Sequence, residues 1–303
     1  MKRIRVLVAG AAGRMGREVV RAVCGQEDME LVGAVDVTDV GKDARAVAGV
    51  EAEGGGANRP GDGAPTERAG GHGNARPTVV VSPSLAEAIS ECSPEVMVDF
   101  TVPSAVKANV TTCLKARVAC VVGATGLTPA DLEEIARRCQ EHNTPALVAP
   151  NFAIGAVLMM QFAAQAARHF DAAEIIELHH SGKVDAPSGT ARRTAKMIAE
   201  ARSAAMGQEA SRLRQGYGAL GSCPTSTPAD SPARGQREAG IHIHSVRLPG
   251  LVAHQEVIFG GLGQTLTIRH DSTSRESFMP GVLLAIRKVR ELSGLVVGLE
   301  GVM

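Results

Sequence analysis

The sequence predicts an α/β protein with a doubly wound parallel sheet and a second α+β domain with a mixed or antiparallel sheet. Three observations favour this fold class. Short apolar runs alternate with helical patterns through the first half of the 303-residue chain, as in a parallel sheet covered by helices. A glycine-rich turn directly follows the first apolar run. After Asn151, strand-like runs follow one another across Pro-Gly and Gly-Gly turns, which is typical of antiparallel or mixed sheets.

The first half contains six short apolar runs with the length of buried strands. Helix-start signals stand between them: Ser84 precedes Glu87 at the capping-box spacing, and Thr128 precedes a proline at the first helical position. The predicted strands are Ile4–Ala9, Leu31–Val35, Thr78–Val81, Val96–Phe100, Ala119–Val122 and Ala146–Ala149.

The second half begins with a long apolar helix and ends with another helical pattern. We expect helices at Gly155–Phe170, Ala191–Arg202 and Glu276–Leu292, and strands at Ala173–His180, Ile241–Arg247, Val252–Phe259 and Gln264–His270. The predicted domains are residues 1–152 with 272–303, and residues 153–271. Residues 51–77 and 221–235, crowded with Gly, Pro, Ala or Ser, are predicted to be surface loops.

Composition excludes several classes of protein. Lys plus Arg equals Asp plus Glu at 32 each, which argues against a broad basic surface for nucleic acid. No apolar run reaches the roughly 18 to 20 residues that span a bilayer. The apolar segment at the N-terminus is also shorter than that of a signal peptide. The six cysteines form no C-x-x-C pair, so we expect a protein of the reducing cytoplasm with mostly buried thiols.

The glycine-rich turn indicates a dinucleotide site. Gly10, Gly13 and Gly16 follow the first strand and open a helix, where backbone amides and the helix dipole can hold a pyrophosphate. Asp36 ends the second strand, where an acid can accept hydrogen bonds from the adenosine ribose. Such a turn followed by such an acid is typical of a Rossmann-like domain. The alternative is a tight turn plus a solvated acid.

The cofactor's phosphorylation state stays open. Val37 follows Asp36, so no arginine stands there to meet a 2′-phosphate, which favours NADH over NADPH. Lys42 and Arg45 are close enough in sequence to supply that charge, so either cofactor fits.

A second cluster carries proton and anion chemistry. Residues 177–191 read E-L-H-H-S-G-K-V-D-A-P-S-G-T-A. His179, His180 and Lys183 bring titratable nitrogens, and Ser188 is a predicted N-cap that points the amides of the next residues outward. This combination suits proton transfer to an anionic small molecule, although an isolated histidine pair is often structural.

These segments together resemble the 4-hydroxy-tetrahydrodipicolinate reductase family (older name, dihydrodipicolinate reductase) of bacterial and plant lysine/diaminopimelate biosynthesis. The resemblance is carried in order by V-A-G-A-A-G-R-M-G at 8–16, D-F-T-V-P at 99–103, G-A-T-G at 123–126, A-P-N-F-A-I-G-A at 149–156, the 177–191 cluster and H-S-V-R-L-P-G at 244–250. It implies an NAD(P)H-dependent oxidoreductase that reduces a cyclic unsaturated dicarboxylate with loss of water. It also implies a homotetramer joined through the second domain's sheet.

The same resemblance implies roles for individual residues. His179 corresponds to the catalytic acid/base and Lys183 to a proton donor, while His180, Gly189 and Thr190 correspond to residues that bind the substrate's carboxylates. The implied cofactor-binding residues are Gly10, Ala11, Ala12, Gly13, Arg14, Met15, Asp36, Gly123, Ala124, Thr125, Ala149, Pro150, Asn151 and Phe152.

Other interpretations are weighed against this one. A thioester-forming semialdehyde dehydrogenase needs a nucleophilic cysteine in its substrate domain, and Cys223, in a Pro/Ser-rich stretch, is a poor candidate. A redox-sensing DNA-binding regulator needs a helix-turn-helix or basic stripe, which the sequence does not offer. His242 and His244 alternate on one predicted strand without a third ligand, so we expect no metal. Arg247 and Arg269 are either substrate contacts or ordinary sheet-edge charges.

Overall fold

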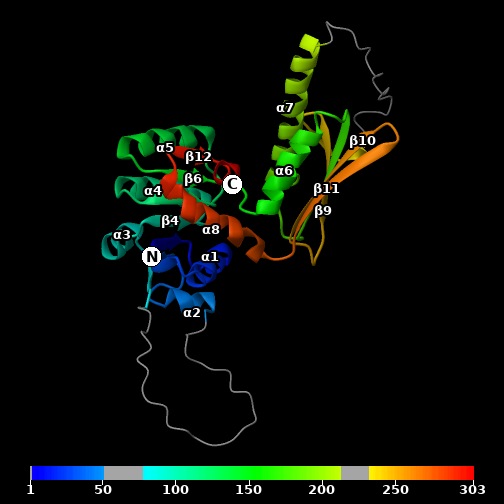
Figure 1. Cartoon of the computed structure of the whole chain (residues 1–303). Helices are drawn as coiled ribbons and strands as arrows, with labels where there is room; N and C mark the ends of the chain where they lie inside the picture. Colours follow the sequence, from blue (N-terminus) through cyan, green and yellow to red (C-terminus); the bar gives the residue numbers. More distant parts are fainter. Residues whose placement is uncertain (1, 51–77, 213–231) are drawn as a thin grey trace, which may run out of the picture. The chain divides into compact units, whose positions relative to one another are not determined.

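The computed structural model describes residues 2–50, 78–212 and 232–303 (Figure 1). They form two compact units, Met1–Val148 with Val282–Val297, and Ala149–Gly281 with Gly298–Gly301. Residues 149–152 and 272–281 therefore group with the second unit, outside the range expected for it. The two segments pack closely on each other, because a Cβ at Gly281 would lie 2.0 Å from the carbonyl oxygen of Phe152. Predicted loop 51–77 and most of 221–235 lie outside the described residues.

The first unit is built on seven parallel strands, which confirms the predicted parallel sheet. Their order across the sheet is β12-β6-β5-β4-β1-β2-β3, and every neighbouring pair is parallel. The sequence did not predict β12, a three-residue strand from the chain's tail. The strands are β1 (Ile4–Ala9), β2 (Met29–Val35), β3 (Val81–Ser82), β4 (Val96–Asp99), β5 (Ala119–Val122), β6 (Ala146–Val148) and β12 (Leu295–Val297).

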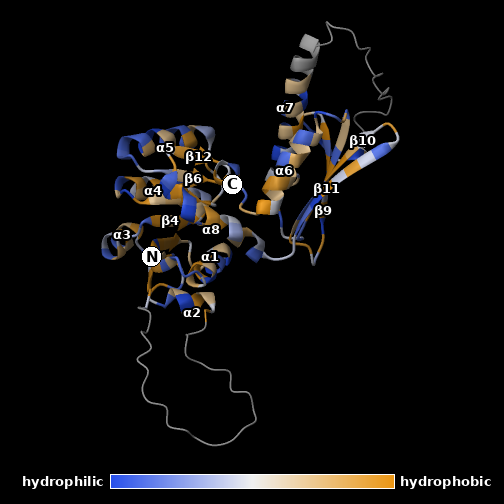
Figure 2. Ribbon diagram, in the orientation of Figure 1, coloured by the Kyte–Doolittle hydropathy of each residue, from blue (hydrophilic) through white to orange (hydrophobic). Residues whose placement is uncertain are grey.

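Helices with one apolar side complete this unit. Figure 2 shows hydrophobic strands beside helices that carry both polar and apolar residues, and Leu7, Met97 and Ile135 are fully buried in the core between them. The Thr128 capping box with Asp131 is present as predicted. The helices are α1 (Arg14–Cys24), α2 (Ala44–Ala48), α3 (Leu85–Cys92), α4 (Pro103–Lys115) and α5 (Pro129–His142).

The second unit is a five-stranded mixed sheet with two long helices, α6 (Ile154–Ala166) and α7 (Gly189–Arg212). The strand order is β11-β10-β7-β9-β8; β7 and β9 run parallel and the other neighbours antiparallel. This confirms the expected mixed sheet. Its strands are β7 (Ala172–His179), β8 (Gln236–Glu238), β9 (Ile241–Arg247), β10 (Ala253–Gly261) and β11 (Gln264–Ser272). Fully buried Ile175, Val257 and Phe259 form its apolar core.

The predicted C-terminal helix Glu276–Leu292 is broken into three pieces. Short 3-10 turns, η3 (Arg275–Phe278) and η4 (Val289–Glu291), flank α8 (Met279–Lys288). Pro280 is the second residue of α8, where its missing N–H costs no helical hydrogen bond. Two further 3-10 turns are η2 (Pro232–Arg234) and η5 (Leu299–Val302). Within the described ranges, no helix is both long and apolar enough to cross a membrane.

Gly16 provides a test of the close approach between β1 and α1. A Cβ at Gly16 would lie 1.8 Å from the carbonyl oxygen of Gly10, and backbone cannot move aside cheaply. We expect Gly16→Ala to lower the free energy of unfolding by about 1–3 kcal/mol, measured by urea denaturation. Gly25→Ala is the control, because φ there is −80° and the nearest atoms are 3.6 Å away. Equal stability of both variants with wild type would contradict the tight packing.

Candidate active site

The glycine turn and Asp36 come together at the carboxyl ends of β1 and β2. Gly10 has φ of +79° and donates its N–H to Val35 O at 2.8 Å. The Asp36 carboxylate accepts from Ala12 N at 2.9 Å and from the backbone and hydroxyl of Thr38 at 3.0 Å. Asp36 therefore lies next to the glycine turn and holds it through the hydrogen bond from Ala12.

The start of α1 fits a pyrophosphate. Its N-cap, Gly13, supplies no side-chain hydrogen bond, and the first turn contains no acidic residue. The helix therefore begins with uncapped amides and no competing carboxylate, which is the arrangement that binds phosphate. Lys42 and Arg17 both pair with Asp39, at 2.7 and 3.1 Å, so these cations already have a carboxylate partner.

The loops after β4 and β5 form a second part of this edge. Asp99 is buried and accepts hydrogen bonds from Thr101 and Asn109, while its backbone oxygen accepts from Gly123 N and Ala124 N. Burial raises the pKa of Asp99, although these hydrogen bonds oppose the shift. A Cβ at Gly123 would lie 2.2 Å from the Phe100 ring, so any larger residue there would force that ring to move. Asp99 thus holds the G-A-T-G loop, which includes Thr125.

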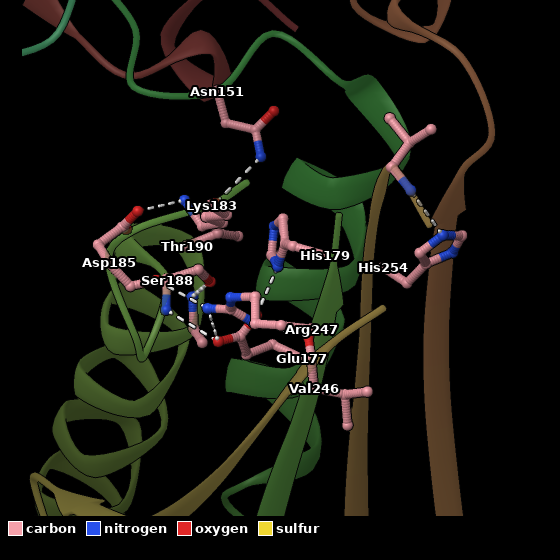
Figure 3. A network of polar contacts seen from close by, with 12 residues as sticks. Asn151, Glu177, His179, Lys183, Asp185, Ser188, Thr190, Val246, Arg247 and His254 are labelled. Atoms are coloured by element: carbon pink, nitrogen blue, oxygen red, sulfur yellow. Dashed lines mark hydrogen bonds and ion pairs between the residues drawn. The ribbon is translucent and has the colours of Figure 1, made fainter. Parts of the chain in front are cut away.

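In the second unit, polar side chains converge on Glu177 (Figure 3). Glu177 is fully buried on β7. His179 lies two residues further along, on the same face of the strand, and its Nδ1 is 2.5 Å from Glu177 Oε2. Arg247, at the end of β9, donates to both oxygens at 2.9 and 2.8 Å.

These contacts determine the ionisation of Glu177. Burial alone would raise the pKa of Glu177, but hydrogen bonds from His179, Arg247 and Ser245 outweigh it and bring the pKa to about 2. The carboxylate is therefore ionised at neutral pH, at the centre of the cluster.

The start of α7 lies beside this carboxylate. Ser188 N donates to Glu177 Oε1 at 3.2 Å, and Ser188 Oγ accepts from Ala191 N at 3.2 Å, as the predicted N-cap requires. A Cβ at Gly189 would meet nothing within 4 Å, so the backbone there is open to a ligand. Asn151 Nδ2 donates to Thr190 Oγ1 at 3.4 Å.

A series of hydrogen bonds from buried side chains holds the backbone of Thr190. Gln255 Nε2 donates to Thr194 Oγ1 at 2.7 Å, and Thr194 Oγ1 donates to the Thr190 carbonyl at 2.8 Å. Gln255 and Thr194 are buried, so this series holds the first turn of α7 against β10.

A small cavity of about 30 Å³ opens beside these residues, enough for about one water molecule. Its lining includes His179, Ser188, Thr190, Asn151, Gln255 and His270. Burial lowers the pKa of His270, whose ring packs against Gly155 at the start of α6. The cavity thus brings His179 together with the open end of α7.

Lys183 lies on the loop between β7 and α7. Its Nζ donates to Asp185 Oδ1 at 2.7 Å (Figure 3), and its side chain is 22% exposed. Donation from Lys183 is the first cause that lowers the pKa of Asp185. The ammonium is therefore held in place by an exposed partner that a second carboxylate could replace.

The two histidines of the pair differ in their surroundings. His179 ends β7 and contacts the cavity and Glu177, whereas His180 follows the strand and lies near Gly182. On β9, His244 Nε2 pairs with Glu174 at 2.7 Å. Within the described ranges no three His, Cys, Asp or Glu side chains gather as metal ligands. Arg269 pairs with Glu256 and Asp271 on the sheet.

Sequence reasoning overlooked Glu177 as a site residue and left Arg247 undecided. The i, i+2 spacing of Glu177 and His179 on a predicted strand was the available signal, because it places both side chains on one face. The Arg247 contact had no such signal, since 70 residues separate it from Glu177 and only the parallel pairing of β7 with β9 aligns His179 with Arg247.

A parallel sheet with a glycine turn at its edge, joined to a unit that carries a histidine–carboxylate cluster, defines a nicotinamide-dependent oxidoreductase. The family models for the N- and C-terminal domains of dihydrodipicolinate reductase match residues 4–152 and 155–303. The chain belongs to the dihydrodipicolinate reductase family, and the resemblance noted in its motifs is confirmed.

Individual relatives agree with this assignment over their full length. The 4-hydroxy-tetrahydrodipicolinate reductases of Moorella thermoacetica and Desulfitobacterium hafniense are 46% and 47% identical, over 99% of this chain and 98% of theirs. The structure of dipicolinate-bound dihydrodipicolinate reductase from Paenisporosarcina sp. TG-14 is 40% identical, with a TM-score of 0.74, and covers 99% of this chain and 100% of that one. The chain's function is accordingly that of a 4-hydroxy-tetrahydrodipicolinate reductase of lysine/diaminopimelate biosynthesis, an oxidoreductase that uses a nicotinamide cofactor.

The low pKa of Glu177 has a measurable effect on stability in acid. A carboxyl whose pKa is about 2 in the folded protein, against an ordinary 4.5, stabilises the fold fully above the higher value and loses that contribution as pH falls through the lower one. The stability advantage of wild type over Glu177→Gln should therefore shrink steadily between about pH 5 and pH 3, measured by urea unfolding. A constant difference across that range would show that the Glu177 pKa is ordinary.

Proposed function

We propose that His179 and Lys183 carry the proton chemistry of this reductase, and that His180, Gly189 and Thr190 bind the carboxylates of 4-hydroxy-tetrahydrodipicolinate. The observation that carries the proposal is the cavity in which His179 meets Ser188 and Thr190 at the open start of α7. One bound substrate could then contact both the acid/base His179 and the anion-binding start of α7.

The cofactor is NADH or NADPH. Gly10–Met15 would hold its pyrophosphate at the uncapped start of α1, and Asp36 its adenosine ribose. Gly123, Ala124 and Thr125 would line the nicotinamide side, with Ala149, Pro150, Asn151 and Phe152 as a hinge segment that also contacts the cofactor. When bound, the nicotinamide supplies the hydride. The Asp36 carboxylate favours an unphosphorylated ribose.

Protons must come from the chain. Reduction of an unsaturated imine leaves an electron-rich carbon that has to be protonated, and a positioned acid contributes roughly 10² to 10⁴ in rate. His179 is placed for this because its ring faces the cavity. Lys183 adds a cation that pairs with a carboxylate, and it can exchange Asp185 for the substrate.

The dicarboxylate itself would bind at the start of α7. The amides of Gly189 and Thr190 follow the N-cap Ser188, where the helix dipole favours an anion. Dipicolinate, the ligand of the related Paenisporosarcina reductase, is a planar dicarboxylate of the same outline. We further propose a cytoplasmic homotetramer joined through the second sheet, whose edge strand β11 is largely exposed.

The activity test is spectrophotometric. Pyruvate and aspartate semialdehyde are condensed by a synthase, and the protein is added with NADH or NADPH; the absorbance of the reduced nicotinamide should fall. Lys183→Ala should lower turnover by roughly 10² or more while the Kd for NADH stays near that of wild type. Unchanged turnover in Lys183→Ala would remove Lys183 from the reaction, and no oxidation by folded wild type with either cofactor would reject the proposal.

The role of Asp36 is tested by cofactor binding. Asp36→Ala should raise the Kd for NADH about tenfold or more, because hydrogen bonds to a charged group contribute about 1.5–3 kcal/mol. The Kd for NADPH should rise less, since its 2′-phosphate no longer meets a carboxylate. Fluorescence titration measures both constants. Asp28→Ala is the control, because Asp28 pairs with Arg287. An equal rise in Kd for both cofactors would show that Asp36 only stabilises the turn and does not contact the ribose.

A further inference from the structure

Glu177 is a buried carboxylate whose two oxygens both accept hydrogen bonds from several elements of the second unit. It is fully buried, and the Ser245 side chain donates to it besides the four contacts that follow. Oε2 faces His179 Nδ1 at 2.5 Å and Arg247 Nη1 at 2.9 Å; Oε1 faces Arg247 Nη2 at 2.8 Å and Ser188 N at 3.2 Å. The carboxylate therefore joins the ends of β7 and β9 to the start of α7.

This geometry determines which nitrogen of His179 carries a proton. The pKa of Glu177 is about 2, so its oxygens only accept hydrogen bonds at neutral pH. The imidazole nitrogen beside Oε2 must then be the donor, because two acceptors cannot share the contact. Nδ1 is protonated, and Nε2 is left as the atom that gives or takes a proton.

We propose that Glu177 is a positioning residue for proton transfer, which fixes His179 as the Nδ1–H tautomer and directs Nε2 toward the substrate. This inference rests on the proposed role of His179 and adds to it the residue that makes the ring competent. A neutral imidazole in water exchanges tautomers freely, so the carboxylate removes both the wrong tautomer and the freedom of the ring to rotate.

Arg247 holds the Glu177 carboxylate in place beside His179. Besides the carboxylate, its guanidinium donates to the carbonyl of Asp185 at 2.7 Å and to that of Val246 at 2.8 Å. Its terminal nitrogens are thus committed to the protein, which assigns Arg247 to positioning and not to the substrate's carboxylates. Through the Asp185 carbonyl, the same side chain ties the loop that carries Lys183 to the carboxylate that orients His179.

The opposite face of β7 supplies a matched comparison. Glu174 also meets one histidine and one arginine, His244 and Arg234. Its odd separation from Glu177 places it on the other face of the strand, and its side chain is 35% exposed. Removing this carboxylate breaks the same kinds of contact without touching His179.

The tautomer can be observed in the unaltered protein. Nitrogen-15 NMR of histidine-labelled wild type should show a proton on Nδ1 of His179, its signals assigned by their loss in His179→Gln. This measurement needs no substitution at Glu177 and holds even if a Glu177 variant fails to fold. A His179 ring protonated at Nε2 alone would overturn the inference.

Kinetics provide the second test. Glu177→Gln should lower kcat by about 10² or more, within the range that a positioned acid contributes, while the Kd values for NADH and for dipicolinate stay near those of wild type. Glu174→Gln should keep kcat near that of wild type. Folded Glu177→Gln with wild-type kcat would reject the positioning role. Full turnover by His179→Gln would instead reject the proposed function, so the two failures are distinguishable.

Discussion

The second unit depends on one buried carboxylate and the cation that neutralises it. Glu177 lies without exposed surface between β7, β9 and the start of α7, and Arg247 binds it through two parallel hydrogen bonds. An ionised group in that position is costly unless it is fully paired. The pairing needs β7 and β9 in parallel register, and it in turn holds the loop from Asp185 to Ser188. The register of the sheet and the arrangement of these polar residues therefore depend on each other.

The first unit also uses carboxylates to hold its loops, and there the donors include backbone amides. Asp36 and Asp99 each stand at the end of a parallel strand and accept hydrogen bonds from the loop that follows or adjoins it. Gly16 and Gly123 lie where a Cβ would collide with Gly10 O or with the Phe100 ring. The loops at the carboxyl edge of the sheet are thus shaped by close backbone approach, and the uncapped first turn of α1 offers its amides to a phosphate-bearing ligand.

Much of this could be predicted from local pattern. Some features depend only on neighbours within a few residues: the Ser84 and Thr128 caps, the glycine turn and the alternation of strands with helices. The element types and the parallel sheet could therefore be predicted from them. The broken tail helix and β12 were missed. Three residues such as Leu295–Val297 form a strand only because β6 lies beside them, and no local pattern records that partner.

The sequence by itself determined the class of chemistry, because His179, Lys183 and the Ser188 cap lie within one short segment. It also determined the family, since the motifs occur in one order along the chain. Only the tertiary structure decided that Arg247 belongs to Glu177, and that His179 faces the cavity while His180 lies beyond the strand. The physical reason is that hydrogen-bond partners 70 residues apart meet through strand pairing, and the register of that pairing is a property of the folded sheet.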